Sequence, residues 1–459
     1  MKQRTIRLAA TGSRIAVGAA IAAACVVGVT GAAAAPWPTV QTEPAYSTVA
    51  PVPGDTVLVC NGSFRALGRD SMRAELMISA AAPQVRVDAA AAQPESADLA
   101  MPELEGGTGA RVLTGVVQGR TAPQFAAVES VTLDDEDLRG LAAAPCREPS
   151  TRSWLVGGDV STGASDVIVL SNPGDVPATV QLDVYGEARA ASTVIVPAKT
   201  QMGVPLASVA SGQQHPVVEV NAEGAPVRAT LQSGLVRTLE PVGIDIQDGV
   251  GGAQNSHTLV GVQVAPITEG DDATGAVVRL LAPEADTEAT VRVRAVGTTS
   301  VLDEYTVPLV TGTPVEIALT GLSDGAYDVQ VDAAAPVVAA ARQMVRSGAV
   351  ADFAWMTPAP QIAAPTMFSV PGDDPATLYL RNTSDEGVTI TLEGQGGRRL
   401  QLGAGGSASL PVSAGGYTLT PSGPVHAAIG IRGADDEAIV AGWPLWASAA
   451  TQQPIVVRR

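Results

Sequence analysis

The hydrophobic and polar positions of this chain follow one pattern that occurs three times. Each copy contains an apolar run, a turn, an alternating run and a closing Pro-Val pair. The turn and the Pro-Val pair begin at Asn172 and Pro226, at Ala282 and Pro336, and at Asn382 and Pro424. Their separation is the same in the first two copies and shorter in the third. The sequence therefore predicts three tandem repeats, the last of them shortened.

The alternating runs predict β-strands with one buried and one solvated face. In residues 291–295 the valines face one way and both arginines the other, which is the period-two pattern of a half-buried strand. No long helical pattern interrupts the repeats, as a βαβ fold would require. We expect an all-β fold built of tandem immunoglobulin-like or fibronectin-like β-sandwiches.

Two of the copies carry a more specific local signal. Gly325 and Gly415 each stand two residues before a tyrosine, Tyr327 or Tyr417, that opens an alternating strand. This order resembles the tyrosine corner of β-sandwich domains, in which the phenol hydroxyl bonds back to the preceding loop. We expect both tyrosines to form such a corner. The first copy has no equivalent tyrosine, so its corner must be built differently.

The first residues have the layout of an export signal. Lys2, Arg4, Arg7 and Arg14 precede an uncharged stretch at 15–35, so the protein is expected to leave the cytoplasm. Small residues at 32–34 suit cleavage, but the stretch is also long enough to span a membrane. A cleaved signal and a retained anchor both stay open. Lipidation of Cys25 is a lesser alternative.

A domain organisation follows from these signals. At 459 residues the chain is too long for a single hydrophobic core. Leu133, Asp137 and Leu141 would share one face of a helix, so we expect a helical turn at 134–141. The predicted parts are a signal peptide or membrane anchor at 1–35, a linker at 36–53, an N-terminal β-rich segment at 54–150, repeat 1 at 151–255, repeat 2 at 256–362 and repeat 3 at 363–459.

Cys60 and Cys146 are the cysteines outside the export segment. Two cysteines in an exported chain usually pair, and a bridge across so long a loop contributes about 4–5 kcal/mol in the chain-entropy description. The alternative is two unrelated buried thiols.

The charge balance limits the partners. Asp and Glu number 46 against 28 Lys and Arg, for a formal net charge of −18. A field of that sign repels phosphate backbones and anionic lipid, which argues against nucleic acid as a partner. We expect envelope proteins or cell-wall glycan as partners, and contact with the membrane through the N-terminal segment if it is not cleaved.

No reactive constellation is visible in the sequence. His215, His257 and His426 are not spaced as two metal ligands on one element, and no nucleophile elbow, zinc-protease helix or phosphate loop occurs. We predict no catalytic, cofactor-binding or metal-binding residue. Ca²⁺ between acidic loops is a weaker alternative, and the other interpretation of those loops is a soluble charged surface. The acidic runs lie at 134–137, 271–272, 373–374 and 435–437.

Aromatic residues make up 3 per cent of the chain, too few for a long sugar-stacking platform. Trp355, Trp443 and Trp446 are the candidates for glycan contact, and they would then be exposed on one groove. The alternative is that these indoles complete a core or seal a junction between domains.

The order of motifs in residues 137–146, 154–158 and 170–174 resembles a family of uncharacterised actinobacterial envelope proteins, defined only as a domain of unknown function. The resemblance implies an exported, membrane-associated protein with paired cysteines, and it implies no activity. We therefore expect a non-enzymatic envelope protein that acts as a structural or interaction module at the outer face of the cytoplasmic membrane. A cell-wall glycan-binding module is the alternative, and a carbohydrate-active enzyme is a distant third.

Overall fold

A computed structural model describes residues 2–34, 46–49, 53–67, 76–119, 121–265, 275–348, 350–372, 374–434, 437–447 and 455–458. The fold is all-β after an N-terminal helix, as the sequence predicts. The chain divides into two units, one formed by 1–51 with 453–459 and the other by 52–452. The N-terminal β-rich segment and the repeats lie mainly in the second unit, and their independence as domains stays a prediction.

The first unit contains helix α1 (Lys2–Ala34) and a two-stranded antiparallel sheet of β1 (Tyr46–Val49) with β34 (Ile455–Arg458). The 20 residues Arg14–Ala33 have a mean hydropathy of 2.2, so this part of the helix is long and apolar enough to cross a membrane. It suits a signal or an anchor. Most of the predicted linker at 36–53 lies outside the described residues.

The N-terminal β-rich segment of the second unit forms small sheets in the strand orders β10-β9-β5, β2-β8-β6 and β3-β4-β7. The expected helical turn at 134–141 is wrong, because β9 and β10 form an antiparallel hairpin across these residues. The strands are β2 (Thr56–Val59), β3 (Phe64–Ala66), β4 (Met77–Ala81), β5 (Gln84–Ala89), β6 (Glu95–Asp98), β7 (Leu104–Glu105), β8 (Arg111–Gly115), β9 (Phe125–Asp134) and β10 (Arg139–Pro145).

Repeat 1 consists, within the described residues, of two four-stranded sheets in the orders β11-β16-β13-β14 and β15-β12-β17-β18. One hydrophobic cluster contains inward residues of both sheets, such as Leu182 and Leu231, so the sheets face each other across a shared core. The elements are β11 (Arg152–Leu155), β12 (Val167–Asn172), β13 (Ala178–Tyr185), β14 (Ala190–Val196), β15 (Thr200–Pro205), α2 (Leu206–Ala210), β16 (Val217–Glu223), β17 (Arg228–Arg237) and β18 (Glu240–Asp248).

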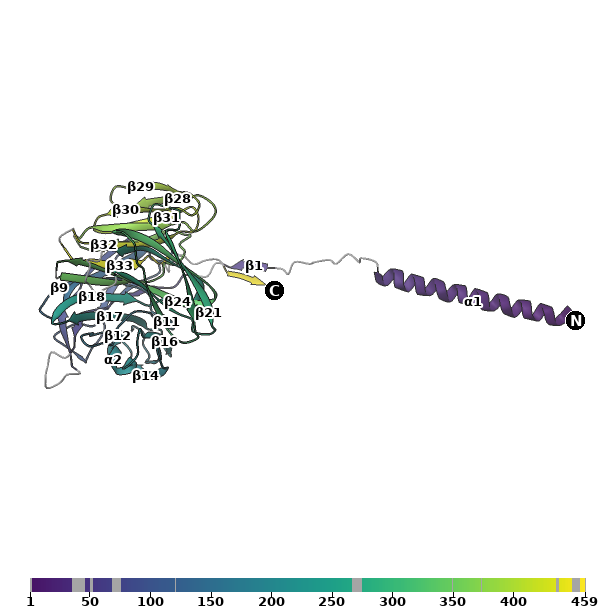
Figure 1. The fold of residues 1–459 in the computed structure, drawn as a ribbon, viewed down its shortest axis with the longest axis horizontal. Helices are drawn as coiled ribbons and strands as arrows, with labels where there is room; N and C mark the ends of the chain where they lie inside the picture. Colours follow the sequence, from purple (N-terminus) through teal and green to yellow (C-terminus); the bar gives the residue numbers. More distant parts are fainter. Residues whose placement is uncertain are drawn as a thin grey trace. The chain divides into compact units, whose positions relative to one another are not determined.

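Repeat 3 has the same two strand orders, β26-β31-β28-β29 and β30-β27-β32-β33. Figure 1 shows β28 to β31 at one end of this unit and α2 with β14 at the other. The strands are β26 (Thr366–Val370), β27 (Ala376–Arg381), β28 (Val388–Glu393), β29 (Arg398–Leu402), β30 (Ser407–Val412), β31 (Gly415–Pro421), β32 (His426–Arg432) and β33 (Val440–Pro444).

Repeat 2 follows the same path with one change. Its strand β24 is 23 residues long and takes the place of two successive strands in the other repeats, pairing first with β21 and then with β20. The predicted alternation holds on β21, where Val291 and Val293 are fully buried while Arg292 and Arg294 are not. The strands are β19 (Gln254–Val264), β20 (Ala276–Leu281), β21 (Thr287–Ala295), β22 (Asp303–Leu309), β23 (Val315–Ala318), β24 (Gly325–Ser347) and β25 (Val350–Met356).

Both predicted tyrosine corners are confirmed. The hydroxyl of Tyr327 donates to the carbonyl of Ser323 at 2.8 Å, and that of Tyr417 donates to the carbonyl of Ser413 at 3.0 Å. Each bond fastens the loop to the start of the following strand.

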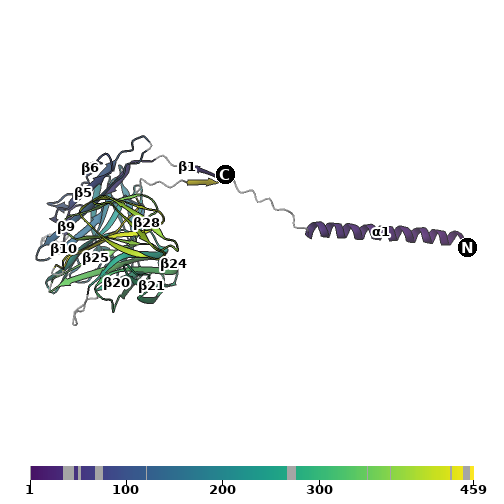
Figure 2. The same ribbon diagram turned by 90° about the horizontal axis from the view of Figure 1, so that it is seen from above.

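The last strand of each repeat is buried on both faces. On β18 every residue after Glu240 is buried, including Asp245, Gln247 and Asp248. One face of such a strand covers the core of its own repeat, and the other packs on a neighbouring part of the chain. β10, β18, β25 and β33 pack against one another in this way. In Figure 2 the N-terminal strands β5, β6, β9 and β10 lie along one side of the unit and β20 and β21 along another.

Candidate functional site

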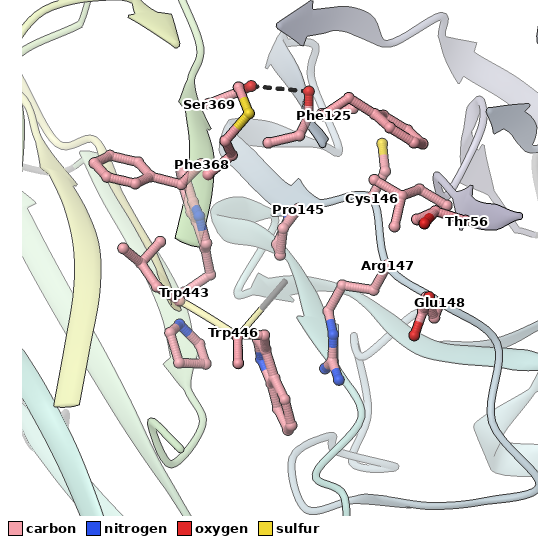
Figure 3. Close-up of a pocket in the computed structure, with 17 residues that line it drawn as sticks. Thr56, Phe125, Pro145, Cys146, Arg147, Glu148, Phe368, Ser369, Trp443 and Trp446 are labelled. Atoms are coloured by element: carbon pink, nitrogen blue, oxygen red, sulfur yellow. Dashed lines mark hydrogen bonds between the residues drawn. The ribbon is translucent and has the colours of Figure 1, made fainter. Parts of the chain in front are cut away.

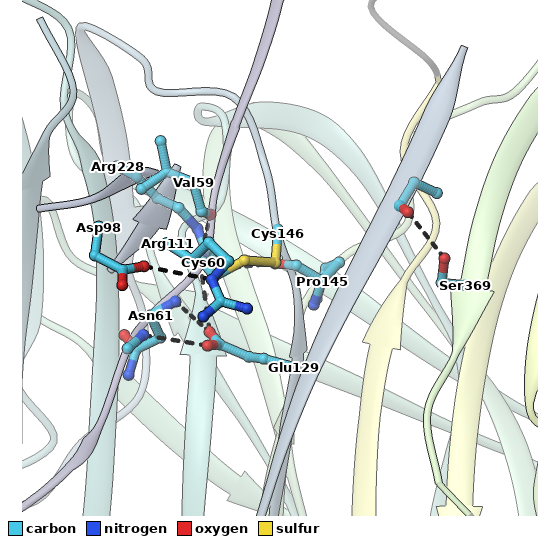
Figure 4. The surroundings of a disulfide bond; sticks show 12 residues. Val59, Cys60, Asn61, Asp98, Arg111, Glu129, Pro145, Cys146, Arg228 and Ser369 are labelled. Atoms are coloured by element: carbon cyan, nitrogen blue, oxygen red, sulfur yellow. Dashed lines mark hydrogen bonds and ion pairs between the residues drawn. A yellow bond between two sulfur atoms is a disulfide. The ribbon is translucent and has the colours of Figure 1, made fainter. Parts of the chain in front are cut away.

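Cys60 and Cys146 form a disulfide, as predicted. Cys60 follows β2 and Cys146 follows β10, and their sequence separation is 86. The Cys60 N–H donates to Arg111 and the Cys146 N–H donates to Ala127, each at 2.9 Å. Figure 4 shows the bridge beside a group of buried charged residues. The disulfide therefore closes the N-terminal segment next to its contact with repeat 1.

Glu129 of β9 is the buried acid of this group. Its carboxylate accepts hydrogen bonds from the backbone N–H groups of Asn61 and Gly62, and Arg228 of β17 lies 3.8 Å away. Burial raises the pKa of Glu129 to about 7, although Arg228 and both N–H donors oppose the rise. Its charge is directed inward, at the junction between the N-terminal segment and repeat 1.

Arg228 is 3% exposed, and both terminal nitrogens of its guanidinium have hydrogen-bond partners. Its guanidinium donates to the carbonyls of Val59 at 2.6 Å and Pro145 at 2.7 Å, and it lies 3.5 Å from Asp248. One arginine of repeat 1 thus holds the ends of β2 and β10 against β18. A buried ion held in this way has a structural role, since removing it would leave the Glu129 carboxylate without this ion pair.

Asp352 of β25 connects all four parts of the second unit. One carboxylate oxygen accepts the N–H groups of Ile244 at 3.2 Å and Phe353 at 3.0 Å. The other accepts those of Leu141 at 3.0 Å and Val440 at 3.1 Å. Ile244 belongs to repeat 1, Phe353 to repeat 2, Leu141 to the N-terminal segment and Val440 to repeat 3. Burial raises the pKa of Asp352 well above its usual range, and the four N–H groups oppose this by stabilising the carboxylate.

Two glycines leave room for this carboxylate. A Cβ on Gly140 would lie 2.2 Å from Asp352 Oδ1, and one on Gly243 would lie 2.8 Å from the same atom. Both residues have a positive φ, of 134° and 148°, which other residues rarely adopt. The backbone of β10 and β18 is therefore shaped to approach Asp352 closely.

A pocket of about 180 Å³ lies between the N-terminal segment and repeat 3. Figure 3 shows Trp443 and Trp446 on one side of it and Cys146 and Arg147 on the other. The Arg147 guanidinium stacks 3.4 Å above the Trp446 ring and pairs with Asp248 at 2.7 Å. Across the same junction, Ser369 donates to the carbonyl of Ala126 at 3.1 Å.

The three candidate tryptophans do not share one exposed groove. Trp355 and Trp443 are 4% and 3% exposed. Trp355 lies beneath the Arg279 guanidinium, at 4.7 Å, away from the pocket that Trp443 and Trp446 line. Trp446 is half-buried. The junction-sealing interpretation fits Trp355 and Trp443, and Trp446 keeps enough surface to meet a ligand.

Trp446 also borders a second, larger pocket of about 460 Å³, whose lining contains several polar side chains and no Asp, Glu, Lys or Arg. His257 and His426 line it, and each ring bonds to a backbone carbonyl, of Val337 at 2.6 Å and Ala359 at 2.7 Å. Burial lowers the pKa of both histidines, so both are neutral at pH 7. Gly251, Gly252, Asn255, Gln330, Gln361 and Thr383 also line this pocket.

Metal ligands are not grouped in the described ranges: there, no set of three or more His, Cys, Asp or Glu side chains is placed to hold an ion. The acidic pairs 271–272 and 435–436, together with residue 373, lie outside the described residues. The Ca²⁺ alternative therefore stays a prediction.

The comparisons place the chain among proteins of unknown function. The profile of a family described as "Family of unknown function (DUF5719)" matches residues 103–413, more than half of the chain. The chain belongs to this family. No curated protein matches it. The part shared with the DUF5719 family contains Glu129, Arg228 and Asp352, whereas Cys60, Trp443 and Trp446 lie outside the matched range.

Sequence reasoning missed Glu129, Arg228 and Asp352. Glu129 and Arg228 lie on strands that carry further charged and polar residues, whereas Asp352 is the one charged residue of the apolar run 350–356. A lone charge in such a strand is the signal that was available, because it must meet partners when both faces are buried.

Proposed function

We propose that this protein is a non-enzymatic interaction module that acts outside the cytoplasm, at the outer face of the membrane. Helix α1 supports export, and it would hold the module at the membrane if it is retained. The Cys60–Cys146 disulfide is compatible with an oxidising compartment.

One observation carries the proposal. The carboxylate of Asp352 bonds to backbone N–H groups from four separate parts of the chain. Its charge therefore fixes four β-rich parts into one body instead of facing a substrate. Glu129 acts in the same way at a neighbouring junction. Buried charges used for assembly support a scaffold with a fixed surface, on which partners bind at the junctions.

The experiment that tests this role is site-directed photo-crosslinking of the full chain in its native membranes. A crosslinker is placed at Gln361, on the exposed rim of the larger polar pocket, and at Leu239, which is 90% exposed in the turn between β17 and β18. We expect discrete adducts from Gln361 and not from Leu239, because a binding surface is local and Gln361 lies where the repeats meet. Equal diffuse labelling at both positions would contradict the proposal.

A second candidate is glycan binding at the larger polar pocket, because a half-buried indole borders neutral hydrogen-bonding groups there. Full chain in detergent is mixed with insoluble cell-wall glycan and sedimented. On this candidate we expect the bound fraction to fall at least severalfold in Trp446→Ala and to stay unchanged in Leu239→Ala. Equal sedimentation of Trp446→Ala and the intact chain would exclude this pocket.

A further inference from the structure

A third pocket, of about 490 Å³, lies at the junction of repeats 1 and 2 and is lined by arginines. Arg237 comes from β17, Arg279 from β20 and Arg342 from β24. The other lining groups are the loop residues 158–161 and 212–215 and Glu316 of β23. Three guanidinium groups around one cavity are unusual in a chain with a net charge of −18.

Arg279 forms the fixed base of this pocket. It is 3% exposed, and its guanidinium donates to Glu316 at 2.9 Å and 3.2 Å. It also donates to the carbonyls of Gly158 at 2.9 Å and Pro216 at 3.0 Å. Its charge is thus neutralised within the protein.

The Glu316 carboxylate also has its partners within the protein. His215 lies 3.4 Å from the carboxylate that Arg279 already binds. Burial alone would raise the pKa of Glu316, but His215 and the nearby arginines lower it to about 2. Glu316 is therefore ionised and already paired on two sides.

Arg237 and Arg342 are the other two arginines that line this pocket. In the part of the chain that the structure describes, neither guanidinium forms an ion pair or a side-chain hydrogen bond. Arg342 is half-buried, and its pKa is lowered by burial and by the like charge of Arg237, against the opposing effect of Glu316 and Asp159. Asp159 itself accepts a hydrogen bond from the Ser161 N–H at 2.7 Å. Arg237 and Arg342 repel each other, Glu316 and Asp159 offset this only in part, and a bound anion would remove the remaining cost.

We propose that this pocket binds a ligand through a phosphoryl group held between Arg237 and Arg342. Planar guanidinium groups match phosphate oxygens in pairs, and two of them suit a group that carries up to two negative charges. The cavity has the size of a typical small-ligand site, so a phosphorylated sugar fits it. The inference rests on this pocket alone and is independent of the neutral pocket beside Trp446.

The test is isothermal titration of the full chain, purified in detergent, with inorganic phosphate and with glucose 6-phosphate. We expect saturable binding that weakens as the salt concentration rises. In Arg237→Gln/Arg342→Gln the affinity should fall at least tenfold. Arg398→Gln/Arg399→Gln removes two exposed charges from β29 of repeat 3 and is the matched control, for which we expect no change.

Two further measurements identify the source of the phosphoryl group and distinguish a loss of binding from a loss of folding. Vesicles of phosphatidylglycerol replace the soluble probes, and binding to vesicles alone would identify a lipid headgroup as the source. Exposed Arg237→Gln is measured alone, with circular dichroism to establish folding, and we expect severalfold weaker binding. No saturable binding to any phosphate probe, or equal binding of unmodified glucose, would overturn the proposal. So would an unchanged affinity in folded Arg237→Gln/Arg342→Gln.

Discussion

Two arginines on equivalent strands have opposite surroundings. Arg228 lies on β17, which borders the N-terminal segment, and its guanidinium bonds to two carbonyls and lies near two acids. Arg342 lies on the part of β24 that takes the place of β17 in repeat 2, and it faces a cavity beside a second arginine. At one junction, the closed junction, the arginine is paired with acids of the protein. At the next, the open junction, the arginine has no ion-pair partner within the described residues. A buried charge marks a binding site only when the protein itself does not neutralise it.

We expect the largest effect at Asp352. Its substitution measures how much free energy of unfolding is lost when a closed junction is disrupted. Asp352→Ala leaves buried N–H groups of Leu141, Ile244 and Val440 without an acceptor. Unsatisfied buried groups are costly, so we expect a loss of about 5 kcal/mol in the free energy of unfolding. Urea denaturation measures it. Asp175→Ala in an exposed turn is the control, and an equal, small change in both variants would contradict a connecting role for Asp352.

The comparison itself is tested by Arg228→Met and Arg342→Met. Arg228→Met leaves Glu129 buried without its cation, so we expect a loss of about 3–5 kcal/mol. Arg342→Met removes a like-charge contact with Arg237, and we expect a change of less than about 1 kcal/mol, with either sign. The two variants are compared by urea denaturation without phosphate. Similar losses in both would erase the distinction between the closed and the open junction.

A pH experiment sharpens the description of the closed junction. The pKa of Glu129 is about 7 in the folded protein against an ordinary value of 4.5. The folded state therefore holds this proton more tightly, and stability falls as the pH rises from about 4.5 to 7. The free energy of unfolding of the unmodified chain should fall between pH 5 and pH 8. In Glu129→Gln we expect this fall to be about 2–3 kcal/mol smaller. Glu393→Gln, at an exposed position on β28, should retain the slope of the unmodified chain.

A smaller effect than at Asp352 or Arg228 is expected away from both junctions. Tyr327→Phe removes one hydrogen bond to the Ser323 carbonyl inside repeat 2, and we expect a loss of about 1 kcal/mol. Thermal unfolding followed by circular dichroism measures it, with Tyr417→Phe as the equivalent change in repeat 3. A loss as large as that of Arg228→Met would mean that the corners, and not the junctions, dominate stability.

The sequence predicted what depends on neighbours along the chain. Alternation identified strands such as β21, and the Gly-x-Tyr order identified the corners at Tyr327 and Tyr417. The paired cysteines followed from their number and the export signal. Each of these signals acts over a few residues or through composition, so no knowledge of tertiary contacts was needed.

The junctions could not be predicted, because they depend on which strands meet. Asp352 and Leu141 are 211 residues apart, and no pattern relates them. The wrong helical turn at 134–141 has a similar cause, since an apparent helical face arises from two paired strands that meet in a turn. Trp355 and Trp443 kept two interpretations, glycan contact and a core or junction, because strands buried on both faces read as short apolar runs with no polar alternation to show where the surface lies.

The four donors to Asp352 also set an order of events as the chain is made. Leu141 emerges early and Val440 near the end of the chain, yet both bond to one carboxylate of repeat 2. The N-terminal segment therefore cannot reach its final state until residues some 300 positions later have joined the folding chain. Such long-range contacts slow folding. A chain truncated before β33 would leave that carboxylate without its donor from repeat 3, so the N-terminal segment and repeat 3 complete their folding together.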